Sequence, residues 1–122
     1  MVTLRTLLIV AIFLPACALQ SGADLSTSPM DRIVQAARAD AAQRSRFAPG
    51  NLTLILAESV TWADSSLGCP RPGLLYTQTL VPGYRVQLRV GDEVFDYHAG
   101  VRGGLVLCPP GLAQDPAPDS RD

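Results

Sequence analysis

The segment YRVQLRVGDEVFDYH, residues 84–98, decides the fold of this chain. Apolar and polar residues alternate on both sides of Gly91-Asp92, which is the pattern of a β-hairpin with a two-residue turn. Pairing across that turn gathers apolar side chains of both strands on one face: Val86, Leu88, Phe95 and Tyr97. The opposite face carries a polar set that we expect to form an exposed patch: Arg85, Gln87, Asp96 and His98.

The residues before this hairpin predict a further strand at Leu52–Trp62 (LTLILAESVTW), which is rich in β-branched and large apolar residues. In an unbroken register the even positions would share one face: Leu52, Leu54, Leu56, Val60 and Trp62. Glu58 would interrupt that face. A β-bulge near Glu58-Ser59, or a strand that leaves the core there, would avoid the cost of burying its carboxylate.

A helix is predicted from about Pro29 to Arg46. Ser28 and Asp31 form the S-x-x-D capping box, and Pro29 takes the first helical position, where a missing N–H costs little. Pro49-Gly50 marks its end. One stripe has apolar residues at helical spacing and would lie against the sheet: Met30, Ile33, Val34, Ala37 and Ala41.

The 21 residues from Ala63 to Gly83 form a connection far longer than is usual in a small domain. We expect its apolar residues to pack over one end of the sheet: Leu67, Leu74, Leu75, Tyr76, Leu80 and Val81. We expect Cys69–Gly73 (CPRPG) to form a stiff, exposed part of the connection. Whether Leu75–Thr79 forms a short edge strand within this connection is left open.

Gly103–Cys108 (GGLVLC) predicts a last strand, which Pro109-Pro110 ends. We therefore expect an α+β domain over residues 28–108, in which one N-terminal helix packs on a small antiparallel sheet of three to four strands. A long ordered loop precedes the central hairpin. Residues 109–122 are polar and rich in Pro, which predicts a disordered tail.

Residues 1–16 predict an export signal, because Arg5 precedes the apolar run Leu7–Leu14. The run Leu14-Pro15-Ala16-Cys17 resembles the lipobox of bacterial lipoproteins, in which the Cys becomes the diacylated first residue. This resemblance implies a lipid on Cys17, a tether over residues 17–27, and a place outside the cytoplasm in a bacterial envelope, on the outer membrane where the host has one. Cleavage after the A-x-A site at residues 16–18 would instead release a soluble protein.

Two cysteines, Cys69 and Cys108, remain once Cys17 is lipidated or removed. Pairing is the default in an oxidising compartment, so we expect a disulfide between them. Two other hypotheses use the same residues. Cys69 with His98 and Asp96 would suit a Cys-His hydrolase, and both Cys with His98 would suit a zinc site, although the spacing typical of zinc ligands is absent. We favour neither, and we expect no cofactor and no metal.

A second resemblance rests on the pattern W-x-D-x-S-L-G-C-P, then Y-x-Q, then P-G-Y-R, then Y-H, which spans residues 62–98. This pattern is similar to a small module of uncharacterised exported bacterial proteins and lipoproteins, and the similarity implies no particular activity. Within and beside it we expect a binding surface made of eight residues: Trp62, Asp64, Arg71, Tyr76, Gln78, Arg85, Asp96 and His98.

The net charge is -1, whereas nucleic-acid-binding domains are usually strongly basic, so the charge does not indicate nucleic-acid binding. We therefore expect a non-catalytic binding module of the envelope, which contacts the membrane through the lipid on Cys17 and binds an unknown envelope protein or small ligand. The alternative is an inhibitor of an extracytoplasmic protease that acts through Cys69–Gly73. Either function would leave the chain without an enzymatic activity.

Overall fold

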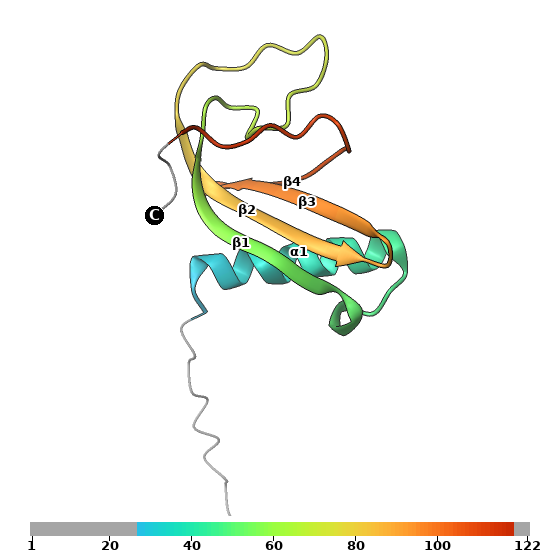
Figure 1. The fold of residues 1–122 in the computed structure, drawn as a ribbon. Coiled ribbons are helices and arrows are strands. Elements are labelled where there is room, and N and C mark those ends of the chain that lie inside the picture. Colours follow the sequence, from blue (N-terminus) through green and yellow to red (C-terminus); the bar gives the residue numbers. More distant parts are fainter. Residues whose placement is uncertain (1–26, 119–122) are drawn as a thin grey trace, which may run out of the picture.

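A computed structural model describes residues 27–118, as one α-helix and a four-stranded antiparallel sheet (Figure 1). The elements are α1 (Pro29–Ser45), a 3-10 turn η1 (Pro49–Asn51), β1 (Thr53–Trp62), β2 (Val81–Val90), β3 (Glu93–Gly100) and β4 (Gly103–Cys108). The strands lie in chain order, β1-β2-β3-β4, and each is antiparallel to the next. The α+β prediction is confirmed. The expected signal peptide, Cys17 and the tether up to residue 26 lie outside the described residues.

Helix α1 forms because its first turn is capped from within the sequence. The Ser28 hydroxyl accepts a hydrogen bond from the Asp31 amide at 3.1 Å, and the Asp31 carboxylate accepts one from the Ser28 amide at 3.2 Å. The helix ends at Ser45, and the C-cap residue Arg46 adopts a left-handed conformation (φ 64°). Arg38 then donates to the Leu52 carbonyl at 2.6 Å, which ties the helix to the chain just before β1. Within residues 27–118, no helix is long and apolar enough to cross a membrane.

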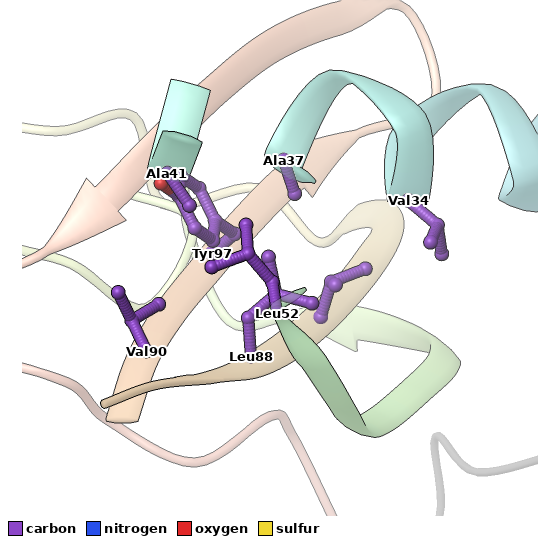
Figure 2. Packing of buried hydrophobic residues seen from close by; sticks show 8 residues of the cluster. Val34, Ala37, Ala41, Leu52, Leu88, Val90 and Tyr97 are labelled. Atoms are coloured by element: carbon purple, nitrogen blue, oxygen red, sulfur yellow. The ribbon is translucent and has the colours of Figure 1, made fainter. Parts of the chain in front are cut away.

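The main core lies between α1 and one face of the sheet, here called the helix face (Figure 2). The hairpin has the predicted register, with Val86 opposite Tyr97 and Leu88 opposite Phe95. Small side chains on α1 let the helix lie close to the sheet, and the buried set is Val34, Ala37, Ala41, Leu52, Val86, Leu88, Val90 and Tyr97. The Tyr97 hydroxyl, which burial would otherwise leave unpaired, donates to Asp40 at 2.8 Å.

The predicted register of β1 is wrong, because its bulge lies between Leu54 and Leu56 and not near Glu58-Ser59. Leu54 pairs with Leu88 on the helix face, whereas Leu56 pairs with Gln87, whose side chain belongs to the opposite face. One extra residue inverts the alternation of a strand, so the even positions of β1 do not share a face. The residues that turn away from α1 are Leu56, Glu58, Val60 and Trp62.

The opposite face, here called the loop face, is also covered (Figure 1). The connection between β1 and β2 contains no strand over residues 63–80, and it folds back over the sheet together with residues 109–118. The Gln114 amide donates to the Gly68 carbonyl at 2.8 Å, and the Ala117 amide donates to the Thr61 carbonyl at 2.9 Å. Residues 109–118, which we expected in a disordered tail, are therefore hydrogen-bonded to the domain.

Candidate functional site

The loop face has a small core of its own, centred on the only Trp and the only His of the chain. Trp62 and His98 are fully buried and stack with ring centroids 4.3 Å apart. The indole N–H donates to the Ala99 carbonyl at 3.0 Å. Gly83 makes this packing possible, because a Cβ there would come within 2.0 Å of the Ala99 oxygen and 2.8 Å of the indole nitrogen. Trp62 is thus a packing centre and not an exposed platform for a ligand.

The prediction that His98 is exposed is wrong. Its Nδ1 lies 2.6 Å from the Leu67 carbonyl oxygen, and because a carbonyl only accepts, Nδ1 carries a proton and donates. Its Nε2 lies 3.2 Å from Asp96 Oδ1 without the alignment of a hydrogen bond. His98 therefore joins the loop, through Leu67, to the sheet. The alternation of the hairpin placed His98 on the loop face correctly, but it could not show that a loop covers that face.

Asp96 is the centre of a half-buried polar network on the loop face. Arg85 contacts both oxygens of its carboxylate, through Nη2 at 2.7 Å and Nε at 3.1 Å, which is the bidentate geometry that strengthens such pairs. Gln87 donates to Asp96 at 3.2 Å, and Arg85 also donates to Asp115 at 3.0 Å. The Arg85 and Asp96 side chains are only 12% and 14% exposed, so the expected open polar patch is wrong here too.

The electrostatics of this network follow from its contacts. Burial by itself would raise the pKa of Asp96, but the contacts with His98 and Arg85 outweigh it and hold that pKa well below its usual range. The Arg85 guanidinium has a raised pKa because it donates to Asp96. Asp96 is therefore a charged structural anchor at neutral pH, and it has no proton to give as a general acid.

The disulfide between Cys69 and Cys108 is present, with Cα atoms 5.6 Å apart, and it links the loop to the end of β4. Both residues are buried. A sulfur held in a disulfide is not a thiolate, so Cys69 is no nucleophile and the Cys-His hydrolase hypothesis loses its first step. Within residues 27–118, no three His, Cys, Asp or Glu side chains are grouped so that they could hold a metal ion.

Three of the remaining predicted surface residues shape the loop. The Asp64 carboxylate accepts a hydrogen bond from the Ser66 amide at 2.8 Å. Hydrogen bonds with Ser66 lower the pKa of the Asp64 carboxyl. The Tyr76 hydroxyl accepts from the Arg71 amide at 2.9 Å, and the Gln78 amide group donates to the Tyr76 carbonyl at 3.3 Å. The eight predicted residues therefore do not form one surface: Trp62 and His98 lie beneath the loop, whereas Arg71 and Gln78 are exposed on it.

The base of the loop is closed by a pair of hydrogen bonds in addition to the disulfide. The Ser65 amide donates to the Thr77 carbonyl at 3.0 Å, and the Thr77 amide donates to the Ser65 hydroxyl at 2.8 Å. Residues 70–75 (PRPGLL), here called the crest, project beyond this closure. The crest is therefore held at its base by a covalent bond and by backbone contacts, and two of its six residues are Pro with a fixed φ.

The crest presents apolar side chains to solvent, which contradicts the prediction that they pack on the sheet. Leu75 is 100% exposed and Leu74 is 57% exposed. Leu80 and Val101 are also largely exposed, and they line one open hollow of about 570 Å³ between the loop and the β3–β4 turn. Exposed leucine on a stiff loop is the feature that sequence reasoning missed. The sequence feature that could have indicated this exposure is the pair Leu74-Leu75 directly after the turn-forming Pro72-Gly73.

Comparison with known proteins gives one similarity. A family model with the description "Domain of unknown function (DUF8738)" matches residues 34–108, which is more than half of the chain. The match runs from the buried stripe of α1 to Cys108, so it includes the whole sheet and both partners of the disulfide. Neither the curated proteins nor the solved structures contain a match.

Proposed function

The chain belongs to the family described as a domain of unknown function, DUF8738, and we propose that it is an envelope-anchored, non-catalytic binding module whose recognition surface is the crest. One observation carries this proposal. A wholly exposed Leu75 is held on a loop that is closed by a disulfide and by the Ser65–Thr77 hydrogen bonds. A stiff apolar loop loses little conformational entropy when a partner covers it, which favours binding.

The polar residues that could perform catalysis have structural partners instead. His98 is buried against Trp62, Asp96 is paired with Arg85, and Cys69 is in the disulfide. A reaction would need at least one of these groups to reach a substrate, yet His98 and Cys69 are buried and Asp96 is only 14% exposed. This arrangement favours binding over catalysis.

The anchor is the second half of the proposal. The lipobox-like run Leu14-Pro15-Ala16-Cys17 supports a lipid on Cys17. The disulfide adds support for a place outside the cytoplasm, because such bonds persist mainly in oxidising compartments. The lipid would hold the module at a membrane, and the crest would meet the partner there.

Photo-cross-linking in the native envelope tests the crest as the recognition surface. A benzophenone amino acid replaces Leu75 in one variant and Ile55 in another, because Ile55 is an exposed apolar residue (42%) on β1 and outside the crest. We expect adducts with an envelope component from position 75 and few from position 55. Equal yields from both positions would show that the crest is no specific surface and would overturn the proposal.

Inhibition of an extracytoplasmic protease is the second candidate, and the same bracing of the crest supports it. An inhibitory loop must be stiff and exposed to enter a protease cleft, and Arg71 and Pro72 are exposed on this braced loop. An inhibitor would form a one-to-one complex with a protease and would protect the enzyme's active site from substrate. Titration against trypsin-like and chymotrypsin-like enzymes decides this candidate. Full residual activity at a tenfold excess of the protein would exclude those enzymes as targets.

A further inference from the structure

We propose that the open edge of β4 binds an extended peptide as an added strand, antiparallel to β4, and that this peptide alternates apolar with acidic side chains. The site is a groove of about 850 Å³ along the edge, where Leu105–Cys108 of β4 meet Arg44 of α1, Glu93 of β3 and Arg71 of the crest. This inference goes beyond the proposed function, because it does not depend on a partner that covers Leu75.

The edge of β4 is open and carries little protection against pairing. Among residues 27–118, no strand lies beyond β4. Natural sheets protect their edges with charged side chains, Pro or bulges. The other edge, β1, has a bulge after Leu54 and the charged Glu58, and its Thr61 carbonyl accepts from Ala117. In contrast, β4 has the sequence GGLVLC without charge or Pro, and a bulge at Gly100 interrupts only its beginning.

The hairpin register shows which backbone groups of β3 point towards β4. Val90 and Glu93 flank the two-residue turn, so they form a hydrogen-bonded pair. Hydrogen-bonded pairs alternate along an antiparallel ladder, so every second residue from Glu93 onwards bonds to β2 and the residues between them face β4. Asp96 and His98 are therefore the residues of β3 whose backbone groups bond to β4.

The same alternation leaves backbone groups of β4 free at the open edge. The partners of these two residues on β4 are Cys108 and Val106. The N–H and C=O groups of Leu105 and Leu107 point away from β3, and no hydrogen bond satisfies them within the described part of the chain. Each of the two residues thus offers one donor and one acceptor to an extended peptide, which is the physical basis of strand addition.

The apolar side chains of the peptide are set by the helix-face side of the groove. Leu105 and Leu107 pack against the core on the helix face, whereas Val106, opposite His98, belongs to the loop face. Side chains that lie directly opposite in a sheet share a face, so peptide residues opposite the two leucines would lie on the helix-face side. Half-buried Phe95 also lines the groove there, which favours apolar residues at these positions.

The acidic side chains are set by the loop-face side, which is basic. Cys108 pairs with Asp96 and so lies on the loop face. The disulfide brings Cys69, and with it Arg71 two residues further on, to this side of the groove. Within residues 27–118, no hydrogen bond or ion pair occupies the Arg71 guanidinium. A peptide residue opposite Val106 would point to this side, where a carboxylate is the complementary group.

The helix-face side of the groove carries both signs of charge. Glu93 shares this face with its partner Val90 of the core, and Arg44 reaches the groove from α1. Arg44 is also bound through Nε to Asp40 at 2.6 Å. These opposite charges give no preference for an anionic residue, so selection by charge rests on Arg71. A second copy of β4 is less complementary than an acidic peptide, because GGLVLC has no carboxylate to place beside Arg71.

Fluorescence anisotropy with synthetic peptides tests the inference on the full chain in a mild detergent. The probe is a labelled eight-residue peptide of alternating Val and Glu, and its control has Lys in place of each Glu. We expect saturable binding of the Val-Glu peptide and binding of the Val-Lys peptide that is weaker by about tenfold or more.

N-methylation of the peptide separates strand addition from attraction by charge alone. In the antiparallel arrangement the Val amides face Leu105 and Leu107, whereas the Glu amides face solvent. Methylation at Val should abolish binding, and methylation at Glu should change it little. Hydrogen exchange locates the peptide: the amides of Leu105 and Leu107 should exchange more slowly when it binds, while that of Val106, which already bonds to β3, should not change.

A charge variant with a matched control identifies the selecting residue. Arg71→Gln should weaken binding of the Val-Glu peptide by about tenfold, because it removes a charged hydrogen bond. Arg32→Gln removes the same charge from an exposed position on α1 outside the groove and should bind like the parent. Neither replacement should change the thermal melting curve.

Three results would overturn the inference: no binding of the Val-Glu peptide, equal binding of the Val-Lys peptide, or equal effects of the two methylations. Slow exchange of Leu105 and Leu107 without peptide that disappears on dilution would also overturn it, because a second copy would then cover the edge. Each of these outcomes leaves the proposed function standing, since that function is tested by cross-linking from position 75 of the crest.

Discussion

His98 shows at the scale of a single residue how a polar side chain can be structural. Its ring is fully buried, one face stacks on Trp62, and Nδ1 donates to the Leu67 carbonyl. The neighbouring Asp96 and Arg85 satisfy each other, so all three titratable groups have structural partners. Such a cluster resembles a catalytic one in sequence, and only its burial and its partners distinguish the two.

The pH dependence of folding should report on Asp96. Its pKa is lower in the folded chain than in the unfolded chain, so its contribution to stability is present above the unfolded value of about 4 and is lost as the pH falls below it. Urea unfolding at pH 7 and at pH 3 measures this loss. Asp96→Asn should be less stable than the parent at pH 7 and should lose less on acidification.

Asp92→Asn, in the exposed hairpin turn, provides the control for the removal of one carboxylate. Its stability should change with pH as that of the parent does. If Asp96→Asn and the parent lost equal stability between pH 7 and pH 3, the ion pair with Arg85 would not contribute in solution.

At the scale of elements, the loop between β1 and β2 behaves as a second layer of the domain. It supplies the Leu67 carbonyl to His98 and the Gly68 carbonyl to Gln114, and Cys69 ties it to the end of β4. The crest lies beyond these contacts and makes few of its own. The loop therefore has a fixed base that completes the core of the loop face and an outer part that is available to a partner.

Removal of the disulfide should loosen the crest before the rest of the domain. The bridge closes a separation of 39 residues, and the chain-entropy model assigns such a closure about 4 kcal/mol. We expect the double variant Cys69→Ser, Cys108→Ser to lose roughly that free energy of unfolding in urea. Hydrogen exchange should accelerate most at the amides of Arg71 and Thr77, while β2 keeps its protection.

Thiol titration of the unfolded, unreduced protein checks the premise of this prediction. Two free thiols from Cys69 and Cys108 would show that the bridge does not form. A uniform increase in exchange across β2 and the loop would instead show that the loop and the sheet unfold as one unit.

In the whole molecule, α1 covers one face of the sheet, and the loop between β1 and β2 covers the other face together with residues 109–118 (Figure 1). The β2–β3 turn lies at the end of the sheet where α1 ends, because Phe47 faces Gly91.

The mature N-terminus should begin at Cys17 and carry a diacylglyceryl group. The motive is the run Leu14-Pro15-Ala16-Cys17 directly after the apolar segment. Mass spectrometry of the protein extracted from its own envelope measures this directly. A chain that begins at Leu19 without acyl mass would show cleavage at the A-x-A site, and the protein would then be released in soluble form.

Several features of the fold follow from short-range patterns in the amino-acid sequence. The capping box at Ser28 fixed the start of α1, and the alternation around Gly91-Asp92 fixed the hairpin register, including the pairs Val86–Tyr97 and Leu88–Phe95. The disulfide followed from counting, because two cysteines were left after Cys17 was assigned to the leader. Each of these inferences needs only neighbouring residues or a count.

Which surfaces are covered depends on contacts between distant segments, and these appear only in the folded chain. The position of the bulge after Leu54 could not be predicted, because β1 begins with a run of apolar residues. A residue inserted anywhere in that run would exchange the two faces of the strand in the same way. The burial of His98 and the exposure of Leu75 depend on where the loop and residues 109–118 lie, and these segments have no periodicity to read. Contacts between segments distant in the chain, such as Leu67 with His98, are set by packing, which a local pattern does not encode.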